Sequence, residues 1–320
     1  MRRFVLLFAT VSLAVIAVAC IGCSSVGGSS SGSGASSPGG SADGSGGGAR
    51  PASSSGYSSS SSRDEAVELQ IYADESLSKA LKEAQDLYSA KNPNITFAET
   101  SFVSSGDLNS MVESHLGAVD IEIAADRNVI DKGIELKLVE RDSRNSLFSG
   151  NLVLVTSLGN EEVEKATFGD IATGLYSICV GNDDDPVGTY ANQSLDTIGC
   201  FANRGDSLGG GSSSSAELDG YVGTPIEGKV TLGTTSGDVC KLAEAGKVDV
   251  ALTYRSDFER FAGLRLLDEV PDEAHERILY QSGICAQAPH ADEAERFIDW
   301  CLMDDSALEV WQKWGFELAA

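Results

Sequence analysis

Short apolar runs, typical of strands, alternate along residues 67–320 with longer segments whose apolar residues recur at helical spacing. In the first part of this region, strand-like and helix-like runs alternate at residues 68–73, 77–88, 95–103, 108–116, 119–124 and 129–136. Because strand and helix follow each other in turn, the pattern predicts an α/β unit with a doubly wound, parallel sheet.

A second set of alternating elements follows an apolar strand at residues 152–155. It occupies residues 177–181, 188–195, 229–232, 237–245 and 248–254, and the chain ends with a strand at 277–286 and helices at 292–303 and 306–314. Two such sets predict two lobes, each a mostly parallel sheet flanked by helices, with a ligand cleft between them. We expect the lobes to be residues 66–150 with 259–320, and residues 151–258. Residues 204–220, rich in Gly and Ser, are expected to form a surface loop.

The first 65 residues lack this periodicity. Residues 1–23 combine a basic start with an apolar stretch too short for a membrane span, which is typical of a secretion signal. Small residues precede both Cys20 and Cys23, as in the bacterial lipoprotein signal, and the flanking residues favour Cys23 as the lipid-modified cysteine. Cys20 is the alternative, and a plain cleaved signal peptide also fits.

Residues 24–65 are almost entirely Ser, Gly and Ala. Such a segment cannot bury a core and should act as a flexible tether. Lipid and tether together predict a protein anchored to the outer face of the cytoplasmic membrane, in an extracellular or periplasmic position.

The formal net charge is −25, from 23 Lys and Arg against 48 Asp and Glu. This balance disfavours nucleic-acid binding, which needs a basic surface. An anionic ligand remains compatible with it because a local field can oppose the global one, but long-range attraction will not assist its capture.

Five of the seven cysteines lie outside the signal, at Cys179, Cys200, Cys240, Cys285 and Cys301. They show no spacing typical of a metal site. Export permits disulfides, but their connectivity cannot be deduced from sequence.

Enzymatic signatures are weak. The three histidines, His115, His275 and His290, are scattered, and neither a nucleophile elbow nor a phosphate-binding loop is present. We therefore expect a protein that is not an enzyme and that has neither a cofactor nor a bound metal cation.

Four junctions share one feature: an apolar run ends at a small or hydroxyl-bearing residue and a helix-like pattern begins at once. They lie at Ser76, Ser105, Val187–Gly188 and Ser236. Helix N-termini present unpaired N–H groups and partial positive charge, so several directed at one point would form an anion site. Each serine alone could instead be an ordinary N-cap.

Five segments in order resemble the molybdate-binding proteins of ABC transporters. They are Tyr72–Leu77, Ser101–Leu108, Val119–Asp126, Asp185–Ala191 and Val250–Asp257, with Trp314–Phe316 closing the match. The resemblance implies a two-lobed periplasmic-binding-protein fold that serves an ABC permease, as a monomer, and binds molybdate or tungstate.

Carried over position by position, the resemblance implies five ligand contacts. Ser76 and Ser105 would give hydroxyl and amide donors, Val187 and Ser236 backbone amides, and Tyr254 a phenolic donor. A tetrahedral dianion offers only acceptors, so a donor-only site suits it, whereas an acceptor in the shell would repel it.

The chain departs from the family at acidic residues. Asp74 and Glu75 stand where the family has small apolar residues, and Asp183–Asp185 crowd the loop before Pro186. If the ligand is a dianion, we expect Glu75 to point outward and Asp74 to bond amides of its own turn. These departures leave sulfate, phosphate, an organic acid or a cation open as ligand. A surface enzyme or adhesion module on the same fold is the remaining alternative.

Overall fold

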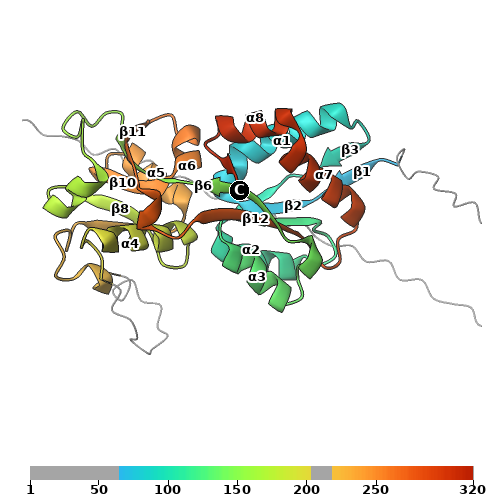
Figure 1. The fold of residues 1–320 in the computed structure, drawn as a ribbon, viewed down its shortest axis with the longest axis horizontal. Coiled ribbons are helices and arrows are strands. Elements are labelled where there is room, and N and C mark those ends of the chain that lie inside the picture. The colour runs from blue at the N-terminus through green and yellow to red at the C-terminus, as the bar shows by residue number, and fades with distance from the viewer. Residues whose placement is uncertain (1–64, 203–217, 320) are drawn as a thin grey trace, which may run out of the picture. The chain divides into compact units, whose positions relative to one another are not determined.

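Two large mixed sheets with helices on their faces, and one separate pair of strands, make up the described part of the chain, residues 65–202 and 218–319 of the computed structural model (Figure 1). The predicted signal, Cys20, Cys23 and the tether up to residue 64 lie outside the described residues, as does most of the predicted loop at 204–220.

The first lobe is built on a sheet of six described strands. Their spatial order is β13 (Glu317–Leu318), β6 (Asn145–Gly150), β12 (Ile278–Ile284), β5 (Ile121–Ala124), β2 (Ile71–Asp74) and β4 (Ser101–Val103). Figure 1 shows its helices on two faces: α1 (Ser78–Lys91), α7 (Ala291–Met303) and α8 (Asp305–Lys313) cover one, and α2 (Ser105–Ser114) and α3 (Arg127–Glu135) cover the other. A separate pair joins β1 (Val67–Leu69) to β3 (Ile95–Phe97).

The second lobe has a sheet of five described strands. Their order is β11 (Leu264–Glu269), β7 (Leu152–Ser157), β10 (Val250–Tyr254), β8 (Ile178–Gly181) and β9 (Val230–Gly233). Its helices are α4 (Pro186–Thr197), α5 (Ser236–Glu244) and α6 (Arg255–Arg260). Short 3₁₀ turns complete the two lobes: η2 (Glu75–Leu77), η3 (Arg141–Ser143), η4 (Phe168–Thr173), η5 (Asp219–Tyr221) and η6 (Asp272–Ala274).

Side-chain alternation in β8 explains why this sheet is covered on both faces. Ile178 and Val180 pack in the apolar cluster that contains the buried face of α4, whereas Cys179 packs in the cluster that contains α5. Successive residues of a strand point to opposite faces, so a strand that is apolar throughout must be covered twice.

The two-lobed α/β fold is confirmed, but each sheet is mixed rather than mostly parallel. The strands that carry βα units pair in parallel, β2 with β4 and β5, and β8 with β9 and β10. The strands that connect the lobes add antiparallel neighbours, since β12 runs against β5 and β6, and β7 against β10 and β11.

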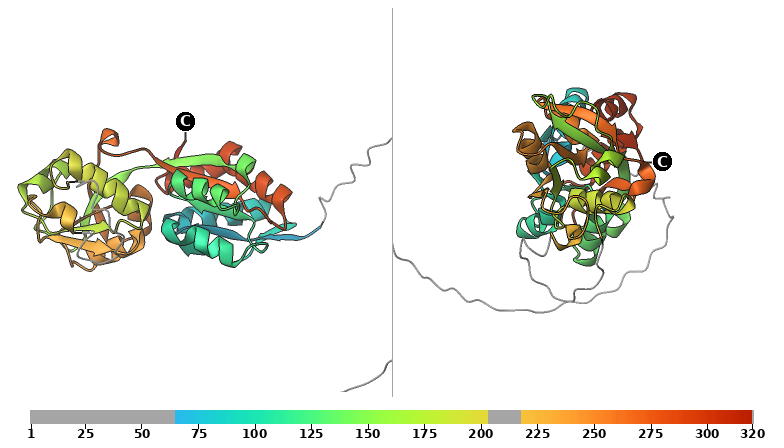
Figure 2. Two further views of the ribbon diagram at one scale, coloured as in Figure 1. Left: turned by 90° about the horizontal axis from the view of Figure 1, so that it is seen from below. Right: turned by 90° about the vertical axis from the view of Figure 1, so that its left-hand side faces the viewer.

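Two segments cross between the lobes, as Figure 2 shows. One is the β6–β7 passage, where only Asn151 separates the strands, and the other leads from β11 to β12. Because β11 belongs to the second sheet, the chain returns to the first lobe after Glu269. The boundary expected at residues 258 and 259 is therefore too early, because it falls inside α6 and before β11, which still belongs to the second sheet.

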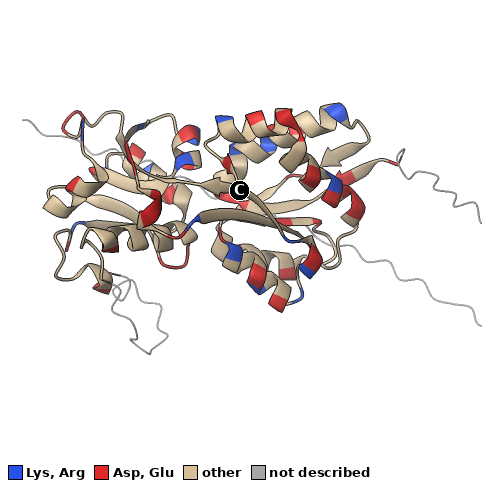
Figure 3. Ribbon diagram, viewed as in Figure 1, with Lys and Arg blue, Asp and Glu red and all other residues tan. Residues whose placement is uncertain are grey.

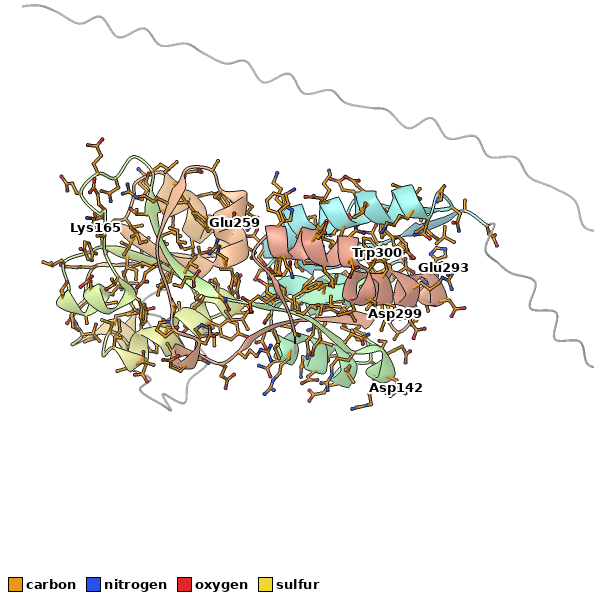
Figure 4. All side chains as sticks on the ribbon, turned by 45° about the horizontal axis from the view of Figure 1, so that its top comes forward. Asp142, Lys165, Glu259, Glu293, Asp299 and Trp300 are labelled. Atoms are coloured by element: carbon orange, nitrogen blue, oxygen red, sulfur yellow. The ribbon has the colours of Figure 1, made fainter. Side chains whose placement is uncertain are left out.

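The three tryptophans pack in the first lobe. Trp311 is buried, whereas Trp300 on α7 (labelled in Figure 4) and Trp314 are partly buried. Trp300 stacks on Phe297, with ring centroids 6.2 Å apart. None of the described helices is long and apolar enough to cross a membrane.

Candidate functional site

Helix capping at the four predicted junctions is performed by neighbours of the predicted residues. The N-caps of η2, α2, α4 and α5 are, in that order, Asp74, Ser104, Asp185 and Thr235. Ser76, Ser105 and Ser236 lie one or two residues beyond these caps, and each is buried. Capping alone therefore does not account for their hydroxyl groups.

Four donors converge on the carboxylate of Asp74, whose residue is 2% exposed. Oδ1 accepts from the amide of Ser76 at 3.0 Å and from its hydroxyl at 2.5 Å. Oδ2 accepts from the amide of Ser105 at 3.1 Å and from its hydroxyl at 2.6 Å. The Ser105 hydroxyl also accepts from the amide of Ala125 at 2.9 Å, which fixes its direction. We call these four donors of Ser76 and Ser105 the cradle.

Two tyrosines adjoin the cradle, one from each lobe. The hydroxyl of Tyr280, on β12, lies 2.9 Å from the hydroxyl of Ser76. Tyr254, at the end of β10, meets Tyr280 edge to face, with ring centroids 6.2 Å apart. Tyr254 is 1% exposed, and its hydroxyl has no hydrogen-bond partner among the described residues.

Asp185 brings α4 of the second lobe to the same place. Its Oδ1 accepts from the amide of Val187 at 3.0 Å, and its Oδ2 accepts from the hydroxyl of Ser104, in the first lobe, at 2.8 Å. The predicted donor Val187 is thus present but engaged by the cap of its own helix.

Burial perturbs both carboxyl groups of this site. Burial raises the pKa of Asp185 to about 7, and the nearby charge of Asp74 adds to the effect. The pKa of Asp74 is also raised by burial, although the hydrogen bonds from Ser105 and Ser76 act in the opposite direction. A buried carboxylate that has another carboxylate nearby holds its proton more strongly than a solvated one.

Glu75 does not point outward, so that expectation is wrong. Its Oε1 accepts from the amide of Gly237, at the start of α5 in the other lobe, and lies 3.5 Å from the guanidinium of Arg260. Arg260 also donates to the hydroxyl of Ser78 at 3.2 Å and to Asp257 at 2.5 Å. Glu75 therefore links the lobes, because a flexible carboxylate can reach a free helix amide.

The expectation for Asp74 is correct only in part. Its Oδ1 does accept from an amide of its own turn, that of Ser76, but Oδ2 turns to Ser105 on α2. Its carboxylate lies inside the predicted ligand position instead of beside it.

The structure thus gathers Ser76, Ser105 and Tyr254 around Asp74 and Asp185. Ser236 is buried next to Gly237, and its hydroxyl is unpartnered within the described ranges. Sequence reasoning missed Tyr280, which reads as an ordinary apolar position of a strand. It also treated Asp185 as crowding, although an acid before Pro186 is a typical helix start.

Next to these residues, a cavity of about 270 Å³ lies between α3 of the first lobe and α4 of the second. Its lining is Asp126, Arg127, Tyr190, Glu276, Arg277 and Leu279. Tyr190 also lies near Tyr254, so the cavity adjoins the site.

Other chemistry in the described residues is limited. No group of three or more His, Cys, Asp or Glu residues in the described ranges is placed to hold a metal ion. The five cysteines outside the signal are buried free thiols in this structure.

Residues 69–317 match the family described as bacterial extracellular solute-binding protein. The chain belongs to this family. The match covers both lobes and ends in β13. It is a family of solute-binding proteins rather than of enzymes. A substrate-binding role in an ABC transporter, as in the relative YvgL, implies a permease partner and a small ligand.

Individual relatives are distant. A Bacillus subtilis (strain 168) protein named as an ABC transporter substrate-binding lipoprotein, YvgL, is 25% identical over 259 residues, which cover 81% of this chain and 89% of the relative. The molybdate-binding protein ModA of Escherichia coli (strain K12) is 22% identical over 258 residues, covering 78% and 89%.

The fold is similar to that of the periplasmic molybdate-binding protein of Azotobacter vinelandii. The TM-score is 0.61 at 16% identity, with 79% of this chain and 100% of that chain covered. The predicted resemblance to the molybdate-binding family of ABC solute-binding proteins is confirmed.

Proposed function

We propose that this solute-binding protein is a monomeric, lipid-anchored component of an ABC importer that captures a tetrahedral oxyanion, molybdate or tungstate, where the lobes meet. The observation that carries the proposal is the convergence of four donors on one anionic group, the Asp74 carboxylate. A cradle that holds a carboxylate in this way has the donors that an oxyanion requires.

The second lobe would complete the shell. The hydroxyls of Tyr254 and Ser236 are buried and unpartnered among the described side chains, so they are free to donate to a ligand. A buried hydroxyl without a partner is costly, and a bound anion would remove that cost.

Isothermal titration calorimetry against molybdate, tungstate, sulfate and phosphate tests the proposal. We expect saturable binding of one molybdate or tungstate per chain. Ser76→Ala and Ser105→Ala should each weaken it about tenfold, near the lower end of the ~1.5–3 kcal/mol range for donors to charge, because the same donors also hold Asp74.

The matched control is Ser114→Ala, which removes an exposed hydroxyl of α2 that donates to the carbonyl of Ser110. This variant should bind like the parent. Parent-like binding by both cradle variants would refute the assignment of the two serines as ligand contacts.

Anchoring is tested separately, because Cys23 and Cys20 lie outside the described residues. Cys23→Ser should release the protein from the membrane fraction and abolish labelling with a fatty-acid analogue. If Cys23→Ser is still retained and labelled, and Cys20→Ser is not, the lipid is assigned to Cys20.

A second candidate ligand is a cation, which binds carboxylate oxygens directly. The buried acidic groups Asp74 and Asp185 favour it, because they add acceptors to the donors of the cradle. The same titrations should include divalent cations and organic acids, and binding of a cation without any oxyanion would replace the first proposal with this one.

A further inference from the structure

The position expected for the ligand is filled by the chain's own carboxylate. Asp74 uses both of its oxygens to accept all four hydrogen bonds of the cradle, and it is almost fully buried. An oxyanion that binds these four donors must therefore share them with the Asp74 carboxylate or displace that carboxylate from them.

A second observation marks the place as a ligand site and not only as a buried acid. The hydroxyl of Tyr254 is buried without a partner in the described part of the chain, and the charges of Asp74 and Asp185 act on it. The hydroxyl of Ser236, on α5 of the same lobe, is likewise buried and unpartnered among the residues described. A buried hydroxyl without a partner indicates that a polar group is missing beside it.

The surroundings of Asp74 oppose any further negative charge. The titratable and charged groups that act on Asp74 and its neighbours in the site are Glu75 on η2, Tyr254 on β10, Tyr280 on β12, Asp185 at the start of α4, and Asp257 and Arg260 on α6. The guanidinium of Arg260 lies against Asp257 and Glu75, so its charge is shared between them. Asp107, in the first turn of α2, is exposed.

We propose that Asp74 makes anion capture proton-coupled: each oxyanion binds together with one proton, which the Asp74 carboxyl takes from solvent and returns on release. The inference rests on the proposed function. An ionised Asp74 would present its negative charge and only acceptor oxygens to a dianion. A protonated Asp74 has one O–H, which can donate to a ligand oxygen, and it leaves donors of Ser76 and Ser105 available.

The burial that raises the pKa of Asp74 supports this step, because it lowers the free-energy cost of protonating the carboxyl near neutral pH. The coupling also gives Asp74 an effect on ligand selectivity, since the affinity for a fully ionised ligand is lowered most at high pH, where Asp74 is ionised.

The test is calorimetric titration of the full-length protein with molybdate from pH 6 to pH 9, in buffers of different ionisation enthalpy. We expect uptake of about one proton per anion, and a Kd that rises about tenfold per pH unit once Asp74 is ionised in the free protein. Asp74→Asn and Asp74→Ala should remove both effects and bind roughly tenfold or more tightly than the parent at the highest pH.

Two variants are used because Asn preserves the shape of the side chain if Ala prevents folding. The control is Asp238→Asn, which neutralises an acid in the first turn of α5 that is paired with Lys241 at 3.0 Å. This variant should keep the parental slope and proton uptake. A pH slope that survives in both Asp74 variants would assign the proton to another group and overturn the inference.

The outcomes separate the two proposals. Tight molybdate binding by the parent at all pH values, without proton uptake, overturns the coupling and leaves the proposed function intact. Failure of the parent and both Asp74 variants to bind any oxyanion at any pH overturns the proposed function, and the coupling with it.

Discussion

At Asp74, a single carboxylate accepts hydrogen bonds from the amide and hydroxyl of two serines that lie 29 residues apart in the sequence. The same residue caps η2 and has Tyr254 and Tyr280 beside it. A small apolar residue at this position would leave the four donors without an acceptor, whereas the carboxylate of Asp74 accepts from all of them. One side chain thus decides whether the site offers donors only.

A second buried acid, Glu122 on β5, lies outside the site and shows the opposite situation. It is fully buried, and neither carboxylate oxygen has a hydrogen-bond partner among the described residues. Burial raises its pKa to about 7. In the unfolded chain Glu122 ionises near pH 4.5. Between pH 4.5 and about 7, Glu122 is therefore protonated in the folded protein and ionised in the unfolded chain.

The difference between the pKa of Glu122 in the folded and in the unfolded protein predicts how the free energy of unfolding depends on pH. Below the unfolded pKa of 4.5 both states are protonated and Glu122 costs no stability. As the pH rises from there to about 7, the fold loses about 3 kcal/mol of stability relative to the low-pH limit. Glu122→Gln should remove that part of the loss. It should therefore stabilise the protein by a similar amount at pH 8 and leave it nearly unchanged at pH 4.

Chemical denaturation of the parent and Glu122→Gln at pH 4, 6 and 8 measures this effect. Glu113→Gln, at an exposed position of α2, is the matched control and should follow the parent throughout. If Glu122→Gln has the same stability difference from the parent at all three pH values, Glu122 does not titrate as described.

At the scale of elements, the start of α2 meets the loop before α4. A Cβ added at Gly106 would lie 2.4 Å from the carbonyl oxygen of Asp184 in the other lobe. Close to this point the hydroxyl of Ser104 donates to Asp185. Since the obstacle at Asp184 is backbone, it cannot turn away as a flexible side chain could, and the two elements would have to separate.

Gly106→Ala should therefore weaken closure without weakening the fold. Alanine in a helix is favoured over glycine by roughly 0.5–1 kcal/mol, so the melting temperature should stay constant or rise. Small-angle scattering of the ligand-free protein should give a larger radius of gyration, and affinity for the ligand should fall.

The control for this experiment is Gly169→Ala, in η4, where the nearest atom to an added Cβ is 3.9 Å away. It should change neither scattering nor affinity. A Gly106→Ala protein with parental scattering and affinity would mean that the contact with Asp184 adapts without lobe movement.

At the scale of the whole molecule, the net charge of −25 sets the field that an approaching anion meets. Figure 3 shows Asp and Glu on the helices of both lobes, with fewer Lys and Arg among them. Like charge slows association, and salt screens it because the Debye length falls from about 30 Å at 0.01 M to about 8 Å at 0.15 M.

The association rate constant for molybdate should therefore rise with ionic strength, by roughly two- to tenfold over this range. Stopped-flow fluorescence in sodium chloride, repeated in potassium chloride to exclude effects of one ion, measures it. A rate constant that falls with salt would show that a local positive field outweighs the global one.

The sequence by itself determined the alternation of strands and helices, the two-lobed fold and the family. The elements and lobes depend on periodicity and on local helix starts, which are properties of neighbouring residues. The family was indicated by the resemblance of five short segments in order. Ser76 and Ser105 could be selected for the same reason, since each follows an apolar strand and opens a helical run. The resemblance could add Tyr254, but not its unpartnered hydroxyl.

Only the tertiary structure decided where the side chains of Asp74 and Glu75 point and where the chain crosses between the lobes. Asp74 reaches Ser105 because β2 and β4 are parallel neighbours whose ends meet at one edge of the sheet. Glu75 could be expected to face water until α5 of the other lobe was seen to offer it the amide of Gly237. The hydrogen bonds that determine the chemistry of this site join residues far apart in the chain, so they cannot be predicted from local sequence.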